Sequence, residues 1–211
     1  MLAHGTTELN VVYMNDSAMV PHFLSYFEER LQEVEDNENF MGLDLEYRAN
    51  QQGVAVIQLC FKRNVMVFHW TSSDKHCPEL TDFLRNDIHF SSVDIRNDKI
   101  KMRHSFGIEI PADCHIDIKD KFMLEHERTS MAHMEVALID KEYTDMKTKF
   151  PKYQHKKWER TPHDGIHIEY AAKDAYVAYE LYRKIRIMNY GQRHLLLAQP
   201  QLFWRLSDSD E

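Results

Sequence analysis

The 211-residue sequence predicts an α/β fold in which a mixed β-sheet, an antiparallel meander joined to parallel strands, is flanked by helices. Three observations predict this fold. Three apolar runs follow one another across short turn-like breaks, helical and extended patterns then alternate, and 43% of the residues are apolar, which is enough for a sizeable core. We expect a single domain over residues 1–206, with its motif-bearing core at about 40–190, and an acidic tail at 207–211.

The N-terminal part begins with an extended segment and then a helix. Residues 8–14 alternate loosely and predict a strand, and the stretch from Ser17 to about residue 35 carries apolar side chains at a spacing of four, which predicts an amphipathic helix. The meander follows, with strands predicted at 40–47, 54–61 and 65–70. Short connections between these strands favour antiparallel pairing.

After the meander, helices and short strands alternate, which is typical of a mixed sheet with helices on its faces. The pattern predicts a helix near 78–86, a strand at 88–94, a helix at 97–106 and a short strand at 115–118. Residues 141–165 are polar, basic and interrupted by proline and glycine, so we expect a loop-rich stretch there. A long helix is predicted from about 166 to 189.

The charge balance and the cysteines narrow the class of protein. Acidic residues number 34 and basic residues 26, and the net charge of −8 disfavours a surface that coats nucleic acid everywhere, while leaving a local basic channel open. The three cysteines lie far apart with no C-x-x-C spacing, so neither a disulfide framework nor a zinc knuckle is predicted. With no secretion signal and no apolar run of transmembrane length, we expect a soluble intracellular protein, cytoplasmic or nuclear.

Acidic residues occur in three contexts that each have an ordinary structural interpretation. Asp44 and Glu46 share one face of a predicted strand, and that face could simply be solvated. Asp98 stands at the start of a predicted helix, where it could complement the helix dipole. Tyr170 and Asp174 share one face of the long helix, where a tyrosine is usually a core residue and an aspartate usually a surface residue. Taken together and in this order, the three contexts favour a functional site.

The three contexts resemble the motifs of the DEDDy exonucleases of the DnaQ-like, ribonuclease-H-like superfamily. Within it, the chain resembles the Werner-syndrome-type exonuclease domains and their short plant relatives. The first motif is GLDLEY followed by VAVIQLC, the second is VDIRNDKIKM, and the third is YAAKDAY, preceded by Trp158 and Pro162. The resemblance covers roughly residues 40–186 and implies a ribonuclease-H-like fold.

The sequence departs from the family pattern at several positions. The second motif of the family usually has a glycine-containing turn before its aspartate, whereas this chain places a further carboxylate there, Asp94. A glutamine often found three residues before the tyrosine of the third motif is His167 here. The histidine subtype would need a histidine five positions before Asp174, and that position is Glu169, so the tyrosine subtype is indicated.

The resemblance implies a metal-dependent 3′→5′ exonuclease that uses two ions of Mg²⁺ or Mn²⁺, the hard cations that carboxylate oxygens bind. In that interpretation Asp44 bridges both ions, Glu46 and Asp174 complete the first site, and Asp98 supports the second through water. Tyr170 orients the attacking water. The expected substrates are 3′ ends of single-stranded nucleic acid, with RNA slightly favoured over DNA because no helicase or polymerase is attached.

Substrate binding requires local positive charge. We expect Lys99 and Lys101 beside the second motif, and Lys156, Lys157 and Arg160 before the third, to bind phosphates. We expect Tyr153 and Trp158 to stack on bases. A solvated charged loop is the alternative for each of these residues taken singly. His163 and His167 have the spacing of a metal-binding pair, but the sequence offers no evident third ligand.

Two other functions remain open at the level of sequence. The first is a non-catalytic or regulatory nucleic-acid-binding module that retains the fold, and the retained set of carboxylates and Tyr170 argues against it. The second is an oligomeric scaffold, which rests on the apolar residues 195–197 and 202–204 near the C-terminus. These residues could pack on the core or form a homo-oligomer contact.

Overall fold

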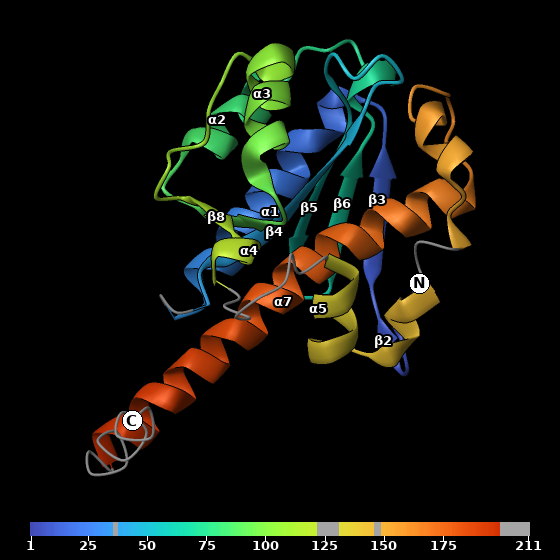
Figure 1. Ribbon diagram of the computed structural model, residues 1–211. Helices are drawn as coiled ribbons and strands as arrows, with labels where there is room; N and C mark the ends of the chain where they lie inside the picture. Colours follow the sequence, from blue (N-terminus) through green and yellow to red (C-terminus); the bar gives the residue numbers. More distant parts are fainter. Residues whose placement is uncertain (36–37, 122–130, 146–148, 199–211) are drawn as a thin grey trace.

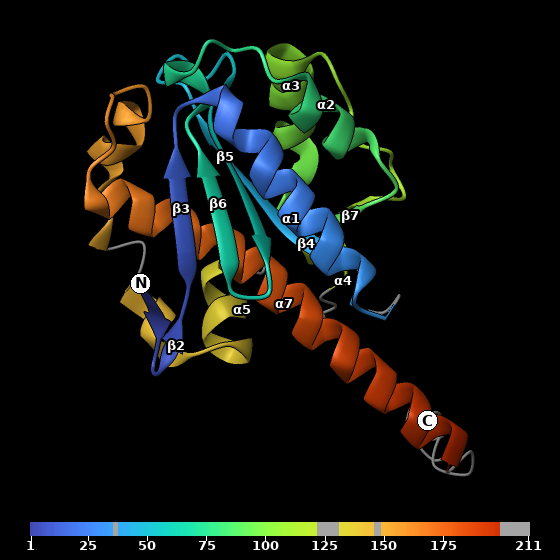
Figure 2. The ribbon, with the colours of Figure 1, turned by 180° about the vertical axis from the view of Figure 1, so that it is seen from behind.

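The protein is built around one six-stranded mixed sheet, seen in Figure 1 and from behind in Figure 2. The computed structural model describes residues 1–35, 38–121, 131–145 and 149–198. In chain order the strands of this sheet are β3 (Asn10–Met14), β4 (Phe40–Tyr47), β5 (Val54–Phe61), β6 (Asn64–Phe68), β7 (His89–Ser92) and β8 (His115–Asp117). A separate two-stranded hairpin, β1 (Leu2–His4) and β2 (Thr7–Glu8), precedes them.

The sheet combines the two kinds of pairing that the sequence predicts. Its order is β3-β6-β5-β4-β7-β8, with β4, β5 and β6 forming an antiparallel meander. The pairs β3–β6, β4–β7 and β7–β8 are parallel. The prediction of a mixed sheet flanked by helices is therefore confirmed.

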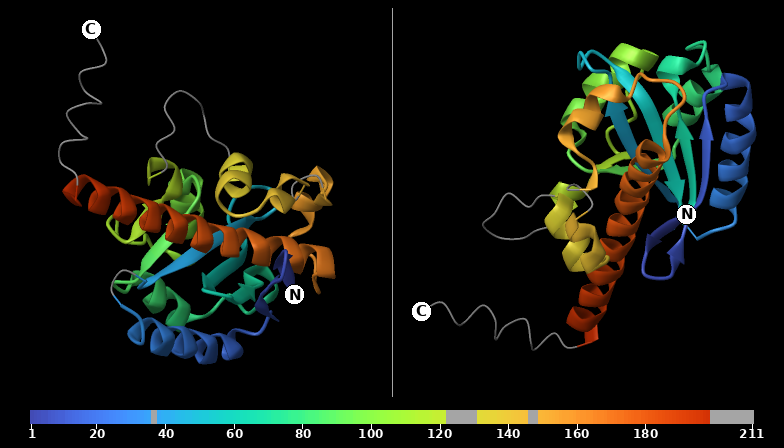
Figure 3. Two further views of the ribbon diagram at one scale, coloured as in Figure 1. Left: turned by 90° about the horizontal axis from the view of Figure 1, so that it is seen from below. Right: turned by 90° about the vertical axis from the view of Figure 1, so that its right-hand side faces the viewer.

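Helices cover both faces of the sheet. Figure 3 (right) shows α1 (Val20–Gln32) on one face and the long helix α7 (Gly165–Ala198) crossing the other. The remaining helices are α2 (Pro78–Arg85), α3 (Ile95–Phe106), α4 (Ile118–Lys121) and α5 (Met131–Leu138), with short 3-10 helices at Ser17–Met19, Trp70–Ser72, Lys141–Asp145 and Lys152–Lys157. Because both faces are covered, every residue of β5 is buried, which explains its nearly continuous apolar run. Among the described residues, no helix is long and apolar enough to cross a membrane.

The structure differs from the predicted elements at several places, and helices α4 and α5 were not predicted. The predicted first strand is interrupted, because β2 ends at Glu8 and β3 begins at Asn10, and the preceding hairpin was not predicted. Gly5 makes that hairpin possible with a φ of +49°, a conformation that glycine adopts without strain. The long helix continues past residue 189 to Ala198, beyond the sheet (Figure 1). Apolar residues 202–204 and the acidic tail lie outside the described residues, and no side chain is described at 195–197.

Helix α7 approaches the sheet very closely at Gly42 on β4. A Cβ atom at this position would lie 2.3 Å from the backbone oxygen of Ala175 and 2.6 Å from the backbone nitrogen of Tyr179. Small residues on α7, Ala171 and Ala175 among them, are fully buried at this contact. The Ser91 hydroxyl strengthens it by donating to the backbone oxygens of Met41 at 3.1 Å and Ala178 at 3.0 Å. Helix α7 therefore lies directly on β4.

We predict that Gly42→Ala lowers the free energy of unfolding by about 1–3 kcal/mol, because the new methyl group meets backbone atoms that cannot move independently of the helix. Chemical denaturation of the two proteins measures the difference. Gly191→Ala is the matched control, because its Cβ would have no atom within 4 Å and alanine favours a helix. Equal stability of the Gly42→Ala protein and the unchanged protein would contradict the close contact.

Candidate active site

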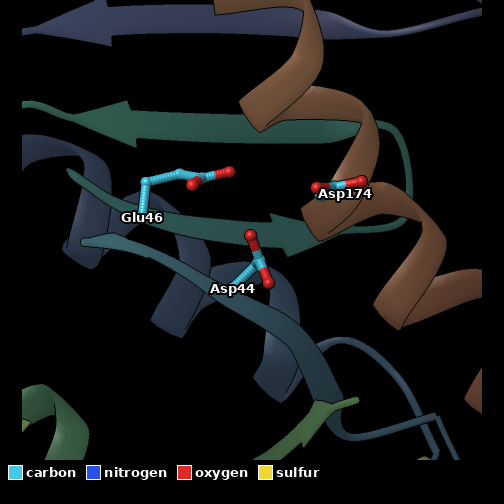
Figure 4. A group of neighbouring side chains, drawn as sticks. All are labelled: Asp44, Glu46 and Asp174. Carbon is cyan, nitrogen blue, oxygen red and sulfur yellow. The ribbon is translucent and has the colours of Figure 1, made fainter. Parts of the chain in front are cut away.

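Three carboxylates meet where α7 crosses β4, and Figure 4 shows them pointing toward one another. Asp44 and Glu46 come from β4, and Asp174 comes from α7. One oxygen from each lies within 4.8 Å of the others. The strand places Asp44 and Glu46 on the same face, because side chains alternate along it. The close packing of α7 at Gly42 then brings Asp174, 130 positions away in the sequence, to that face.

Electrostatic repulsion within this carboxylate cluster is strong. Burial, followed by the negative charges of Asp174, Glu46 and Asp98, raises the pKa of Asp44 well above its usual range. Burial also raises the pKa of Glu46, and His155, whose Nδ1 lies 3.8 Å from the Glu46 carboxylate, partly offsets that rise. An oxygen-only set of ligands that repel one another fits a hard divalent cation, because the cation supplies the missing positive charge.

Asp98 lies beside the cluster rather than within it. It is buried in the first turn of α3 and accepts a hydrogen bond from the Tyr47 hydroxyl. Burial is the main cause that raises the pKa of Asp98 to about 7, and the Tyr47 hydrogen bond acts in the opposite direction. Because Asp98 also raises the pKa of Asp44, its charge acts on the cluster even though it is outside the group of three.

Asp94 does not compete with the cluster. Its φ of +62° is the left-handed conformation that glycine favours, so Asp94 occupies the turn where the family usually has glycine. Its carboxylate pairs with Arg96 at 2.7 Å and Lys119 at 3.0 Å. These hydrogen bonds lower the pKa of Asp94. The carboxylate is therefore held in local ion pairs.

Tyr170 is held beside the carboxylates by aromatic neighbours. Its ring stacks on Phe150 with a centroid separation of 4.1 Å and meets the edge of His155 at 5.4 Å. Burial, followed by the charge of Asp174, raises the pKa of Tyr170 far above its usual range, and its hydroxyl is hydrogen-bonded to Asp174. The hydroxyl therefore keeps its proton at neutral pH and can donate it in a hydrogen bond.

His163 and His167, whose spacing suggested a metal-binding pair, pack against each other, and His163 also packs against His69. His163 lies between His69 and His167, with ring centroids 3.9 Å and 5.4 Å away and nearly parallel planes. Burial lowers the pKa of His69 to about 4 and that of His163 to about 3, so both rings are neutral. Within the described ranges, the one group of three or more side chains placed to hold a metal ion is the carboxylate cluster. These histidines instead pack the segment that precedes α7.

The structure corrects one substrate-binding expectation, that Trp158 stacks on a base. Trp158 is only 1% exposed, and its ring packs on Phe150 and against the edges of His163 and His167. A buried ring offers no free face to a base. The pattern around Trp158 resembled that of an exposed aromatic because its sequence neighbours are charged, yet the fold turns the ring inward. Tyr153, 59% exposed, is the accessible aromatic side chain nearby in sequence.

The predicted cations differ in their exposure and in their neighbours. The Nζ atom of Lys101 lies 5.4 Å from the ring centre of Tyr47, the residue that donates to Asp98. Lys99 is partly buried on α3, and its charge lowers the pKa of His115. Lys157 lies over the ring of Tyr153 at 4.6 Å. Lys156 and Arg160 are exposed. These five cations are all at least partly exposed, so they are available to anions.

A cavity of about 370 Å³ adjoins Tyr170, large enough for a small ligand. Its aromatic lining includes Tyr143 and Phe150, and its charged lining consists of Glu142, Lys149, Glu169 and Lys173. Of these, Lys173 and Glu169 form an ion pair at 2.6 Å.

Two neighbours of the carboxylates were not singled out in the sequence. A register shift between Glu46 and Tyr47 interrupts the alternation of β4, and Tyr47 reaches Asp98, so strict strand periodicity would not find it. His155 comes from a 3-10 helix whose position no local pattern fixes. Both contacts depend on tertiary packing.

Comparisons with known proteins identify the family and the fold. The family model described as 3′-5′ exonuclease matches residues 22–188, which is most of the chain. No curated protein sequence matches. Among solved structures, the catalytic core of RRP6 from Trypanosoma brucei has a TM-score of 0.68 and 14% identity, covering 92% of this chain and 51% of that one. The shared fold is the ribonuclease-H-like fold that the sequence predicts.

Two RNase D structures are also similar. RNase D from Escherichia coli has a TM-score of 0.65 and 17% identity, covering 93% of this chain and 49% of that one. RNase D from Trypanosoma brucei, solved with GMP, has a TM-score of 0.66 and 16% identity, covering 83% and 57%. The chain thus spans about half the length of the RRP6 catalytic core and of Escherichia coli RNase D. At such low sequence identities, the similarity shows the fold. Because the family model covers residues 22–188, the chain belongs to the 3′-5′ exonuclease family.

Proposed function

We propose that the protein hydrolyses phosphodiester bonds from the 3′ ends of single-stranded nucleic acid, with two divalent cations, Mg²⁺ or Mn²⁺, as cofactors. The observation that carries this proposal is the convergence of Asp44, Glu46 and Asp174 within 4.8 Å in a chain of the 3′-5′ exonuclease family. Four of the proposed catalytic groups are carboxylates, and their oxygens suit these cations better than softer metals.

Each side chain has a defined part in this proposal. Asp44, Glu46 and Asp174 would hold the cations, and Asp98 would support the second one from its place beside Tyr47. Bound divalent cations supply an attacking water of lowered pKa and offset charge on the leaving oxygen. Tyr170 remains protonated, so it orients the attacking water through a hydrogen bond rather than acting as a base.

RNA is the favoured substrate in this proposal. The support comes from two similar structures: Escherichia coli RNase D is described as an exoribonuclease, and Trypanosoma brucei RNase D was solved with a ribonucleotide. Because the net charge of the chain is −8, phosphate binding depends on local cations, for which Lys99, Lys101, Lys156, Lys157 and Arg160 are the candidates. Single strands suit a buried site because one unpaired end can enter it.

An oligonucleotide assay tests the proposed function. Purified protein is incubated with 5′-labelled RNA and DNA of the same sequence in Mg²⁺, Mn²⁺ or EDTA. We expect a ladder of products shortened one nucleotide at a time, faster for RNA and absent in EDTA. Substrates blocked at the 3′ end should remain intact. Binding of the oligonucleotides without any shortening in either cation would instead favour the non-catalytic nucleic-acid-binding module.

We predict that Asp44→Asn lowers kcat/KM by on the order of a thousandfold, because a bound cation contributes several kcal/mol of charge stabilisation and each 1.4 kcal/mol is tenfold. Without cations, thermal stability should hold or rise, since one repelling carboxyl is removed. Asp94→Asn is the matched control, because Asp94 pairs with Arg96 and Lys119 outside the cluster. Normal turnover by Asp44→Asn would show that the wrong carboxylate carries the chemistry.

We predict that Asp98 makes the protein less stable as pH rises when EDTA removes cations. Folding raises the pKa of Asp98 from 3.8 to about 7, so the carboxyl contributes stability at low pH that is lost as pH rises through about 7. Thermal unfolding midpoints should therefore fall less steeply between about pH 4 and 7 in Asp98→Asn than in the unchanged protein. If the unfolding midpoints of the two proteins changed equally with pH, burial would not raise the pKa of Asp98.

We predict that Tyr170→Phe lowers kcat by about tenfold to a hundredfold with little change in KM, because the ring keeps its stacking on Phe150 while the water-holding hydroxyl is lost. Steady-state kinetics separates the two constants. Tyr179→Phe removes a hydroxyl from another buried tyrosine of α7 and should leave kcat unchanged. An unaltered kcat in Tyr170→Phe across pH would reduce Tyr170 to a packing residue.

A further inference from the structure

A buried glutamine lies without hydrogen bonds in the middle of β5. Gln58 is 0% exposed, and neither its Nε2 nor its Oε1 has a hydrogen-bond partner among the described residues. Every other residue of β5 is apolar. An amide that loses water without gaining a partner costs free energy, so an apolar residue of equal volume would serve the core better. Packing alone therefore does not account for Gln58.

The register of the sheet places Gln58 beside the carboxylate cluster. Gln58 is the direct partner of Asp44 across the β4–β5 pair, and directly opposed residues point to the same face with Cβ atoms about 4.5–5.5 Å apart. That face is the one that α7 covers, because Gly42, two positions from Asp44, meets the backbone of α7. The amide therefore lies under α7 at the edge of the carboxylate site.

The other neighbours of Gln58 on this face of the sheet offer little to an amide. Val67 is its partner on β6, and Val56 and Cys60 precede and follow it on the same face of β5. The two valines are hydrocarbons and cannot form a hydrogen bond with the amide. The Cys60 thiol is only a weak hydrogen-bonding group. The strong acceptor on an adjacent position is the Asp44 carboxylate.

We propose that Gln58 is a positioning residue of the active site, whose amide nitrogen donates a hydrogen bond to the Asp44 carboxylate that holds a cation. The inference rests on the proposed function, since it assigns a partner to a proposed cation ligand. A hydrogen bond to a carboxylate is charge-assisted and about twice as strong as one between neutral groups. The desolvation cost of the amide is thus offset when the cation binds, and Gln58 strengthens cation binding.

The test measures Mn²⁺ affinity and cation-free stability in the same variants. Gln58→Met keeps the volume of the side chain and removes its hydrogen-bonding atoms. We expect Mn²⁺ binding, followed by calorimetry or by electron paramagnetic resonance, to weaken about tenfold or more, as is typical when a partner of a metal ligand is lost. In EDTA, the thermal unfolding midpoint should stay the same or rise, because an unpartnered buried amide is gone. A residue with a purely structural role would not produce this opposite pair of effects.

Two controls separate the possible outcomes. Cys60→Ala alters the same face of β5 and should leave Mn²⁺ affinity unchanged, so equal weakening in both variants would overturn the inference. Unaltered affinity in Gln58→Met would also overturn it. If Gln58→Met does not fold, Gln58→Leu is measured with the same expected result. Failure of the unchanged protein to bind Mn²⁺, or unaltered binding in Asp44→Asn, would instead overturn the proposed function and this inference with it.

Discussion

The packing of α7 directly on β4 is the constraint on which the site depends. A glycine at position 42 leaves room for the backbone of the helix, and the Ser91 hydroxyl joins the backbones of β4 and α7. Asp174 reaches Asp44 and Glu46 because the backbones of α7 and β4 lie so close together. A larger residue at position 42 would push α7 away from β4. The distance from Asp174 to Asp44 and Glu46 would then increase.

This packing also determines the electrostatics. Carboxyls that are buried together favour their neutral forms, so folding raises the pKa values of Asp44, Glu46 and Asp98. When these carboxyls are ionised, they lower the free energy of unfolding unless a positive charge enters the site. The surrounding polar groups, Tyr47 and His155 among them, compensate only in part. A strained electrostatic balance of this kind is typical of functional sites.

Local patterns predicted the meander, the alternation of helices and strands, and the shared face of Asp44 and Glu46, because period and spacing decide these features within a few residues. The resemblance to a family supplied Asp98, Tyr170 and Asp174 as partners, since no local rule joins positions so far apart. Sequence reasoning did not find the inward turn of Trp158 or the contact between His155 and Glu46. Both depend on how the segment before α7 folds back on the sheet.

Diffraction from crystals soaked in Mn²⁺, at wavelengths on either side of the manganese absorption edge, tests the central claim that the convergent carboxylates form a cation site. Anomalous density is expected among Asp44, Glu46 and Asp174, with a second ion about 3.5–4 Å from the first on the side of Asp98. Anomalous density confined to other carboxylates, with none among these three in crystals that bind Mn²⁺ elsewhere, would contradict the account.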